Sequence, residues 1–236
     1  SLESGAAVTR GLREAGIPAE QVDVSGAPGE IRALPFDLVF LALHGEFGED
    51  GQVQALLDEA RIPYTGSSAA CCTLTINKIE TKRRLRAERI PTPAWVDFAS
   101  PAEGIEAARA LPLPVVVKPA SRGSSVGTTI VRAAGELAAA LDLALAYDRQ
   151  GLVEAFVEGR ELTAGMLDGR ALPLIELQPA RDFYDYEAKY KDDRTGYRCP
   201  APLEADATSA LQRLGLAVDE VLGVEHLGRV DMILGA

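Results

Sequence analysis

The residues with the clearest chemical potential form a loop between two short β-branched runs. Val116 and Val117 lead into Lys118, and residues 119–127 (PASRGSSVG) follow before a second run at residues 128–131. β-Branched residues favour strands, whereas Gly and Ser give a turn conformational freedom and exposed backbone N–H groups. A lysine on a strand beside such a loop is suited to hold a polyphosphate. A hairpin with a polar tip has the same local sequence, so this segment alone does not establish its function.

The composition is that of a soluble globular protein with a sizeable core. Hydrophobic residues make up 47% of the 236 residues and charged residues 25%, and a chain of this length usually forms more than one lobe. No apolar run approaches the roughly 20 residues that span a bilayer, and no export signal opens the chain. Cys71, Cys72 and Cys199 form no CxxC pattern, so we expect reduced thiols in a cytoplasmic protein.

The net charge of −11 restricts the partners that the protein can have. Binding of nucleic acid requires a basic face that neutralises phosphates, so we expect no nucleic acid partner. We also expect no membrane partner. The negative charge does not prevent binding of a nucleotide, because a few local lysines and a metal ion set the potential of a small cleft.

The first 75 residues predict a small Rossmann-like lobe whose first strand is missing. Residues 1–16 favour a helix that ends at Gly16. The continuous apolar run FDLVFLAL at residues 36–43 predicts a buried parallel strand, and the polar segment HGEFGEDG at residues 44–51 follows it. A polar loop between a strand and a helix is the usual site geometry of an open α/β sheet.

The rest of the chain predicts two further groups of helices and strands. A helix over residues 67–87 carries Lys78, and strands are expected over residues 151–157 and 161–167. Residues 182–202 form a long polar and aromatic segment with little periodicity. A loop of this length is usually functional, and we expect it to act as a lid.

Five motifs in sequence order make the chain resemble the D-alanine–D-alanine ligases of the ATP-grasp superfamily. They are HGEFGEDG, VKPASRGSSVG, FVEGRELT, YDYEAKY and GRVDMI, and the resemblance covers essentially the whole chain. It implies an α/β (α+β) ATP-grasp fold with an N-terminal Rossmann-like lobe. The expected lobes are residues 1–75 for substrate, 76–155 with the phosphate loop, and 156–236 with the lid at 182–202.

The resemblance implies an ATP-dependent carbon–nitrogen ligase. ATP phosphorylates the carboxylate of one D-alanine, the amine of a second D-alanine attacks the acyl phosphate, and phosphate leaves. The implied cofactors are ATP and Mg²⁺ (or Mn²⁺), and the dipeptide serves peptidoglycan synthesis in the bacterial cytoplasm. Phosphoryl transfer depends mainly on positioning and on cations around the phosphate oxygens. The family also implies a homodimer.

The same resemblance assigns the residues that contact the nucleotide. Lys78 and Lys118 match the two lysines on the ATP phosphates, although a solvated helix face is an alternative for Lys78. The other implied residues are Gly123, Ser124, Ser125 and Val126 over the phosphates, Glu154, Ala155, Val157 and Glu161 around adenine and ribose, and Lys189 near the γ-phosphate. For Glu161, a surface carboxylate at the start of a strand is the alternative.

Four residues are implied to be catalytic and one to bind metal. Ser124 matches a serine near the amine of the first D-alanine, and Tyr190 matches a lid tyrosine that reaches this serine. His44 matches a histidine near the same substrate, with a purely loop-orienting histidine as the alternative. Arg229 matches an arginine that stabilises the transferring phosphate, and Asp231 matches a Mg²⁺ ligand. Strand alternation places these last two on one face, where a salt-bridged pair on an edge strand is the alternative.

Two departures from the family pattern concern the ends of the chain. The family has a glutamate shortly before the pair matched by Ser1 and Leu2, and a Glu-x-Asn after GRVDMI, and neither is present. Because Asp231 alone would hold Mg²⁺ poorly, we expect a chain truncated at both ends and inactive by itself. Two alternatives stay open: another ATP-grasp D-alanine ligase with D-lactate or D-serine as acceptor, or a catalytically incomplete nucleotide-binding protein.

Overall fold

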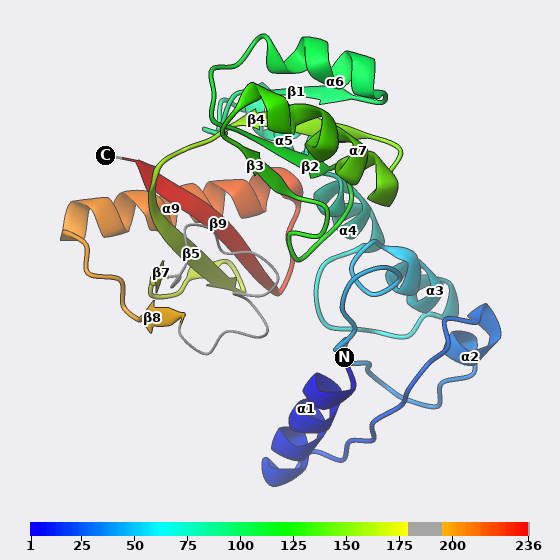
Figure 1. Ribbon diagram of the computed structural model, residues 1–236. Helices are drawn as coiled ribbons and strands as arrows, with labels where there is room; N and C mark the ends of the chain where they lie inside the picture. The colour runs from blue at the N-terminus through cyan, green and yellow to red at the C-terminus, as the bar shows by residue number, and fades with distance from the viewer. Residues whose placement is uncertain (179–194, 236) are drawn as a thin grey trace.

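The computed structural model describes residues 1–178 and 195–235 and contains three groups of elements in chain order (Figure 1). The first group, at the lower right of Figure 1, contains α1 (Leu2–Glu14), α2 (Pro28–Arg32) and α3 (Gln52–Ala60). Gly16 follows α1 with a φ of +79°, as expected for a glycine that ends a helix. In the described part of the chain, no helix has both the length and the apolarity needed to cross a membrane.

The buried strand expected over residues 36–43 does not form, so this prediction was wrong. The described residues give this segment only an isolated parallel bridge, between Val39 and Tyr64. Leu38 and Phe40 are 58% and 43% exposed. A strand is stabilised by pairing along its length, and the described residues around this segment supply a partner at a single position. The apolar pattern therefore identified a segment that can pair but not a strand.

The helix expected over residues 67–87 is two helices, α4 (Ala69–Ile76) and α5 (Lys78–Ala87). Asn77 separates them, because its side chain accepts hydrogen bonds from the backbone N–H groups of Ile79 and Glu80. This is the usual capping role of asparagine at a helix N-terminus. The break makes Lys78 the first residue of α5.

The second group is a four-stranded antiparallel sheet with helices on both faces. Its order is β1 (Trp95–Phe98), β4 (Gly151–Ala155), β2 (Val115–Pro119) and β3 (Thr129–Val131). On one face lie α6 (Pro101–Ala108) and α7 (Leu137–Tyr147), as Figure 1 shows, and the 3-10 helix η1 (Ala134–Glu136) directly precedes α7.

Both faces of this sheet are packed with apolar side chains. Val115 and Val117 of β2 are fully buried in the cluster under α6 and α7. On the opposite face, Ile79 of α5 packs with Leu152 of β4 and with Ala120. Lys118 therefore lies near the end of a strand, β2, that is packed on both faces.

The third group is a second antiparallel sheet covered by a long helix. It contains β6 (Arg170–Ala171), β5 (Gly159–Leu167), β7 (Ile175–Gln178) and β8 (Gly196–Arg198), and β9 (Leu227–Gly235) pairs with β5. The covering helix is α9 (Ala205–Leu222), whose Gly215 lies so close to the sheet that an added Cβ would be 3.2 Å from Ala164 and Met166. The antiparallel sheets make the fold α+β.

Candidate nucleotide-binding and catalytic site

The phosphate loop predicted from the sequence is the connection between β2 and β3, at residues 120–128. Ser124, Ser125 and Gly127 all have positive φ angles, of 52°, 59° and 70°. A Cβ at Gly127 would lie 2.8 Å from the Tyr147 ring and 2.9 Å from Pro119, so this position requires glycine. Non-glycine residues in the left-handed region are strained, and such strain clusters at ligand-binding sites.

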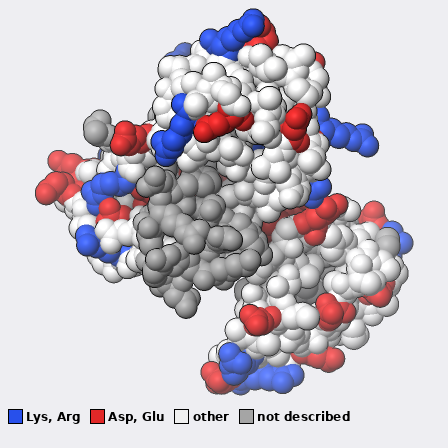
Figure 2. All heavy atoms as spheres, viewed as in Figure 1, with Lys and Arg blue, Asp and Glu red and all other residues white. Residues whose placement is uncertain are grey.

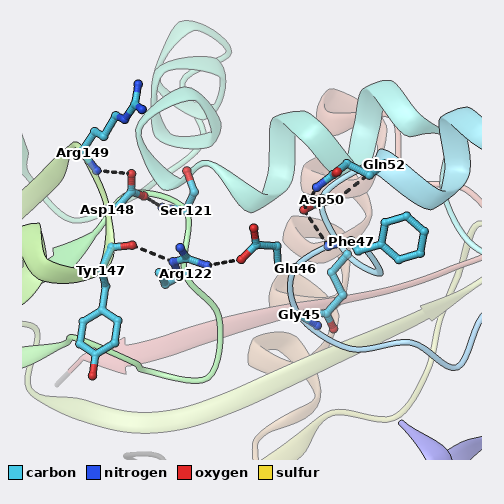
Figure 3. Close-up of polar contacts among 11 residues, drawn as sticks. Gly45, Glu46, Phe47, Asp50, Gln52, Ser121, Arg122, Tyr147, Asp148 and Arg149 are labelled. Atoms are coloured by element: carbon cyan, nitrogen blue, oxygen red, sulfur yellow. Dashed lines mark hydrogen bonds and ion pairs between the residues drawn. The ribbon is translucent and has the colours of Figure 1, made fainter. Parts of the chain in front are cut away.

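The base of this loop is fixed to α7 and reaches the segment at residues 44–51 (Figure 3). The backbone N–H of Ser121 donates to the Asp148 carboxylate (2.7 Å), just past the end of α7. Arg122 donates from Nε to the carbonyl of Tyr147 (2.8 Å) and pairs through Nη1 with Glu46 (2.9 Å). Arg122 thus connects two motifs that lie far apart in the sequence.

Lys78 lies against the base of the same loop. Its backbone N–H donates to the carbonyl of Ala120 (2.8 Å), and its Nζ donates to the carbonyl of Arg122 (2.5 Å). The side chain is half-buried rather than solvated. The alternative of a solvated helix face is therefore wrong for Lys78, and the base of the loop has two candidate phosphate ligands, Lys78 and Lys118.

The Glu154 carboxylate lies between two lysines. It pairs through Oε2 with Lys118 of β2 and through Oε1 with Lys82 of α5, the latter at 2.9 Å. Lys82 also donates to the Thr92 hydroxyl (2.5 Å). Sequence reasoning missed Lys82, although its position four residues after Lys78 places both lysines on one side of α5.

The charges in this cluster shift the pKa values of its members. Burial raises the pKa of the Glu154 carboxyl, but Lys118 and Lys82 lower it by more, so the net pKa is below the ordinary value. Burial lowers the pKa of Lys82, and the nearby Glu154 offsets only part of this. Two ammonium groups and one carboxylate leave an excess positive charge beside the loop, which is the sign needed to attract phosphate.

This local positive charge contrasts with the face of the molecule that Figure 2 draws. On the face drawn in Figure 2, the basic and acidic side chains of the described residues are interspersed and form no broad basic area. The charge available to a triphosphate therefore comes from individual lysines at the loop.

Three predicted nucleotide-binding residues lie in or beside the link between the two sheets. Ala155 ends β4, and its backbone N–H already donates to Ala94 (2.8 Å), so this N–H is not available to a base. Val157 lies in the link, and Glu161 lies two residues inside β5. Both are half-buried, and their contact with a nucleotide stays a prediction.

Arg229 and Asp231 lie on one face of β9, as the alternation predicted. The Thr163 hydroxyl donates to Asp231 Oδ1 (2.8 Å), and Arg229 Nη2 donates to Oδ2 (3.1 Å). Among the described strands β9 pairs only with β5, so the alternative of a salt-bridged pair on an edge strand describes this geometry. Thr163 was not predicted, and it orients the carboxylate directly from the neighbouring strand.

The segment at residues 44–51 is ordered by its own carboxylates. Asp50 accepts hydrogen bonds from the backbone N–H groups of Phe47 (2.8 Å) and Gln52 (3.1 Å), as Figure 3 shows. Burial raises the pKa of Asp50, but these hydrogen bonds lower it by more. His44 is exposed at the start of the segment, and its role with substrate stays a prediction.

A magnesium ion would find one suitable carboxylate at this site. The described residues contain no group of three or more His, Cys, Asp or Glu side chains placed to hold a metal. Mg²⁺ is commonly bound by one or two carboxylates together with substrate phosphates and water, and Asp231, half-exposed on β9, fits the role of one such ligand. Tyr190 and Lys189 lie outside the described residues.

Comparison with known proteins gives the family. The model of the D-ala D-ala ligase N-terminus matches residues 1–67, and that of the D-ala D-ala ligase C-terminus matches residues 86–236. A D-alanine–D-alanine ligase of Hydrogenovibrio crunogenus is 41% identical over 236 residues, which are 99% of this chain and 75% of that protein.

Solved structures agree with the sequence comparison. The D-alanine–D-alanine ligase of Bacillus anthracis superimposes with a TM-score of 0.86 and 32% identity, over 99% of this chain and 77% of that one. The same enzyme complexed with ATP superimposes with a TM-score of 0.82 and 26% identity, over 99% and 76% of the two chains. This chain, with its α+β ATP-grasp fold, therefore belongs to the D-alanine–D-alanine ligase family.

Proposed function

We propose that this protein uses ATP to join two D-alanines into D-alanyl-D-alanine. The observation that carries the proposal is the placement of Lys78 and Lys118 at the base of a glycine-dependent loop. Two ammonium groups beside a strained turn form a site for a polyphosphate. Family membership supplies the class of reaction.

The first step transfers the γ-phosphoryl group to the carboxylate of one D-alanine. A carboxylate oxygen forms a bond to phosphorus, the bond from phosphorus to the bridging oxygen breaks, and ADP leaves. Lys78 and Lys118 hold the phosphates, the loop at residues 123–126 covers them, and Lys189 approaches the γ-phosphate. Fixed cations stabilise the charge that is redistributed during the transfer.

The second step forms the peptide bond. The amine of the second D-alanine attacks the acyl carbon and loses a proton, the bond from carbon to the phosphate oxygen breaks, and phosphate leaves. Arg229 stabilises the oxyanion, while His44 and the pair Ser124 and Tyr190 position the first D-alanine. Glu154, Ala155, Val157 and Glu161 surround adenine and ribose.

Asp231 would hold a Mg²⁺ or Mn²⁺ ion together with phosphate oxygens, and the ion would neutralise charge on the phosphates. We further propose that the protein acts as a homodimer in the bacterial cytoplasm, where its product enters peptidoglycan. The division into lobes at residues 1–75, 76–155 and 156–236 belongs to the same proposal.

The test is phosphate release by the protein at its natural length, with ATP, Mg²⁺ and D-alanine. We expect release to require D-alanine, to fail with L-alanine, and to fall at least about a hundredfold in Lys118→Met. Assays in which D-lactate or D-serine is the second substrate distinguish the alternative acceptors. Binding of ATP without any release on addition of D-alanine would instead support a nucleotide-binding protein.

A further inference from the structure

We infer that Lys82 is a positioning residue for the ATP site: it holds Glu154 in its ionised form, so that Lys118 can leave Glu154 for a phosphate. This inference rests on the proposed function, because it concerns how the ATP site is prepared. It assigns a role to a lysine that neither motif spacing nor family resemblance indicated.

The two lysines on Glu154 differ in how firmly they are held. The Lys82 side chain is only 8% exposed, and Thr92 fixes its Nζ in addition to Glu154. The Lys118 side chain is 23% exposed and lies two residues before Ala120, at the base of the phosphate loop. Lys118 is therefore the partner that an incoming phosphate can reach, and Lys82 is the one that stays.

The charges of the cluster explain why a second lysine is needed. When Lys118 turns to a phosphate, Glu154 keeps Lys82 and remains a paired carboxylate. Without Lys82, the same movement leaves a buried carboxylate with no counter-ion, which is strongly unfavourable. Lys118 would then stay with Glu154, or Glu154 would take up a proton.

This reasoning predicts a linkage between ATP binding and protons that a purely structural lysine would not produce. In Lys82→Met, Glu154 is paired with Lys118 before ATP binds and is unpaired afterwards, so the pKa of Glu154 rises on binding. Binding then takes up a proton and strengthens as the pH falls. In the wild type, Lys82 keeps Glu154 charged throughout, and this contribution is absent.

The experiment compares Lys82→Met with Lys82→Arg and with Arg83→Met in the protein at its natural length. Arg83 is a matched control, because it is the next residue on α5 and forms exposed pairs with Glu80 and Asp97. We expect Lys82→Met to raise the KM for ATP about tenfold near pH 8 with little change in kcat. The ratio of the KM of Lys82→Met to that of the wild type should decrease as the pH is lowered toward about pH 6. Lys82→Arg should retain most of the wild-type affinity for ATP.

A double variant keeps the inference testable even if Lys82→Met does not fold. In a Glu154→Gln background there is no carboxylate to neutralise, so adding Lys82→Met should change ATP-analogue binding, measured by calorimetry, by less than about threefold. A tenfold loss in that background would overturn the inference. A pH-independent KM ratio in Lys82→Met, or an unchanged KM with lowered thermal stability, would overturn it as well.

Failure of the proposed function would look different. Wild-type protein that binds no ATP analogue would overturn the proposed function, and this inference with it. Wild-type protein with normal ligation and a Lys82→Met variant with wild-type KM at every pH would overturn this inference alone.

Discussion

Two sets of ion pairs hold the candidate site together, and they differ mainly in their access to water. Lys82, Glu154 and Lys118 lie within the packed second group, where the Glu154 side chain is 9% exposed. Arg122 and Glu46 lie at the surface, with side chains 41% and 71% exposed. The Lys82–Glu154 and Arg122–Glu46 pairs each join distant parts of the chain, at separations of 72 and 76 residues.

The difference shows that similar geometry can have very different energetic weight. When an exposed ion pair forms, its charges lose hydration that is about as favourable as their mutual attraction. Such a pair therefore contributes little to stability. A buried pair has lost its hydration, so removal of one partner leaves a charge without compensation. We therefore expect the buried cluster to control folding and ATP affinity, and the exposed pair to adjust the position of the loop.

The largest effect is expected for Glu154→Gln, which tests the difference between the buried and the exposed ion pairs. The change leaves the buried Lys82 and the partly buried Lys118 without a carboxylate, and we expect it to lower the free energy of unfolding by about 3 kcal/mol. Denaturant titration measures the effect, with Glu46→Gln as the control from the exposed pair. Equal losses in the two variants would contradict the distinction between buried and exposed pairs.

The pH dependence of stability also tests the contribution of the buried Glu154. The pKa of Glu154 in the folded protein is below its ordinary value of 4.5, so the unfolded chain binds the proton more readily. The contribution of Glu154 to stability is therefore complete above pH 4.5 and is lost as the pH falls through the folded pKa. Unfolding midpoints measured from neutral to acid pH should fall less steeply in Glu154→Gln than in wild type.

A backbone change in the phosphate loop should have an effect of intermediate size. Gly127→Ala places a methyl group against Tyr147 and Pro119 at a φ of +70°, and we expect a loss of about 2 kcal/mol. Gly135→Ala is the matched control, because a Cβ there has nothing within 4 Å. A thermal melt in which both variants match wild type would show that the loop adjusts more easily than its packing indicates.

The smallest expected effect is at the exposed pair. Glu46→Ala should change the free energy of unfolding by less than about 1 kcal/mol. Arg122→Ala should cost slightly more, because Arg122 also donates to the Tyr147 carbonyl. A double-mutant cycle of Arg122 and Glu46 with a coupling energy above about 2 kcal/mol would show that this exposed pair contributes as much to stability as the buried cluster.

Sequence patterns correctly predicted the features that depend only on a few neighbouring residues. Gly16 ends the first helix, Lys118 leaves a strand into a glycine-dependent turn, and β9 places Arg229 and Asp231 on one face. Each of these features depends on neighbouring residues only, so periodicity and turn chemistry are sufficient to find them.

The failures concern interactions between distant parts of the chain. Residues 36–43 have the composition of a buried strand, but pairing depends on a neighbour that the segment itself does not encode. Lys82 lies in the charged stretch KIETKRR, which is typical of a solvated helix face. Only the packing of α5 against the sheet places it beside Glu154. By contrast, the helix break at Asn77 was visible in principle, since asparagine is a preferred helix cap.

The capped start of α5 has a consequence for the length of this segment. Asn77 sets the first residue of the helix, and Lys78 and Lys82 then follow at the first position and one turn later. A residue inserted between them would rotate everything after it by about 100° around the helix axis. Lys82 would turn away from Glu154 while Lys78 kept its place at the loop. The four-residue spacing thus fixes the direction of Lys82 relative to Lys78. We expect substitutions between the two lysines to be tolerated far better than any insertion or deletion there.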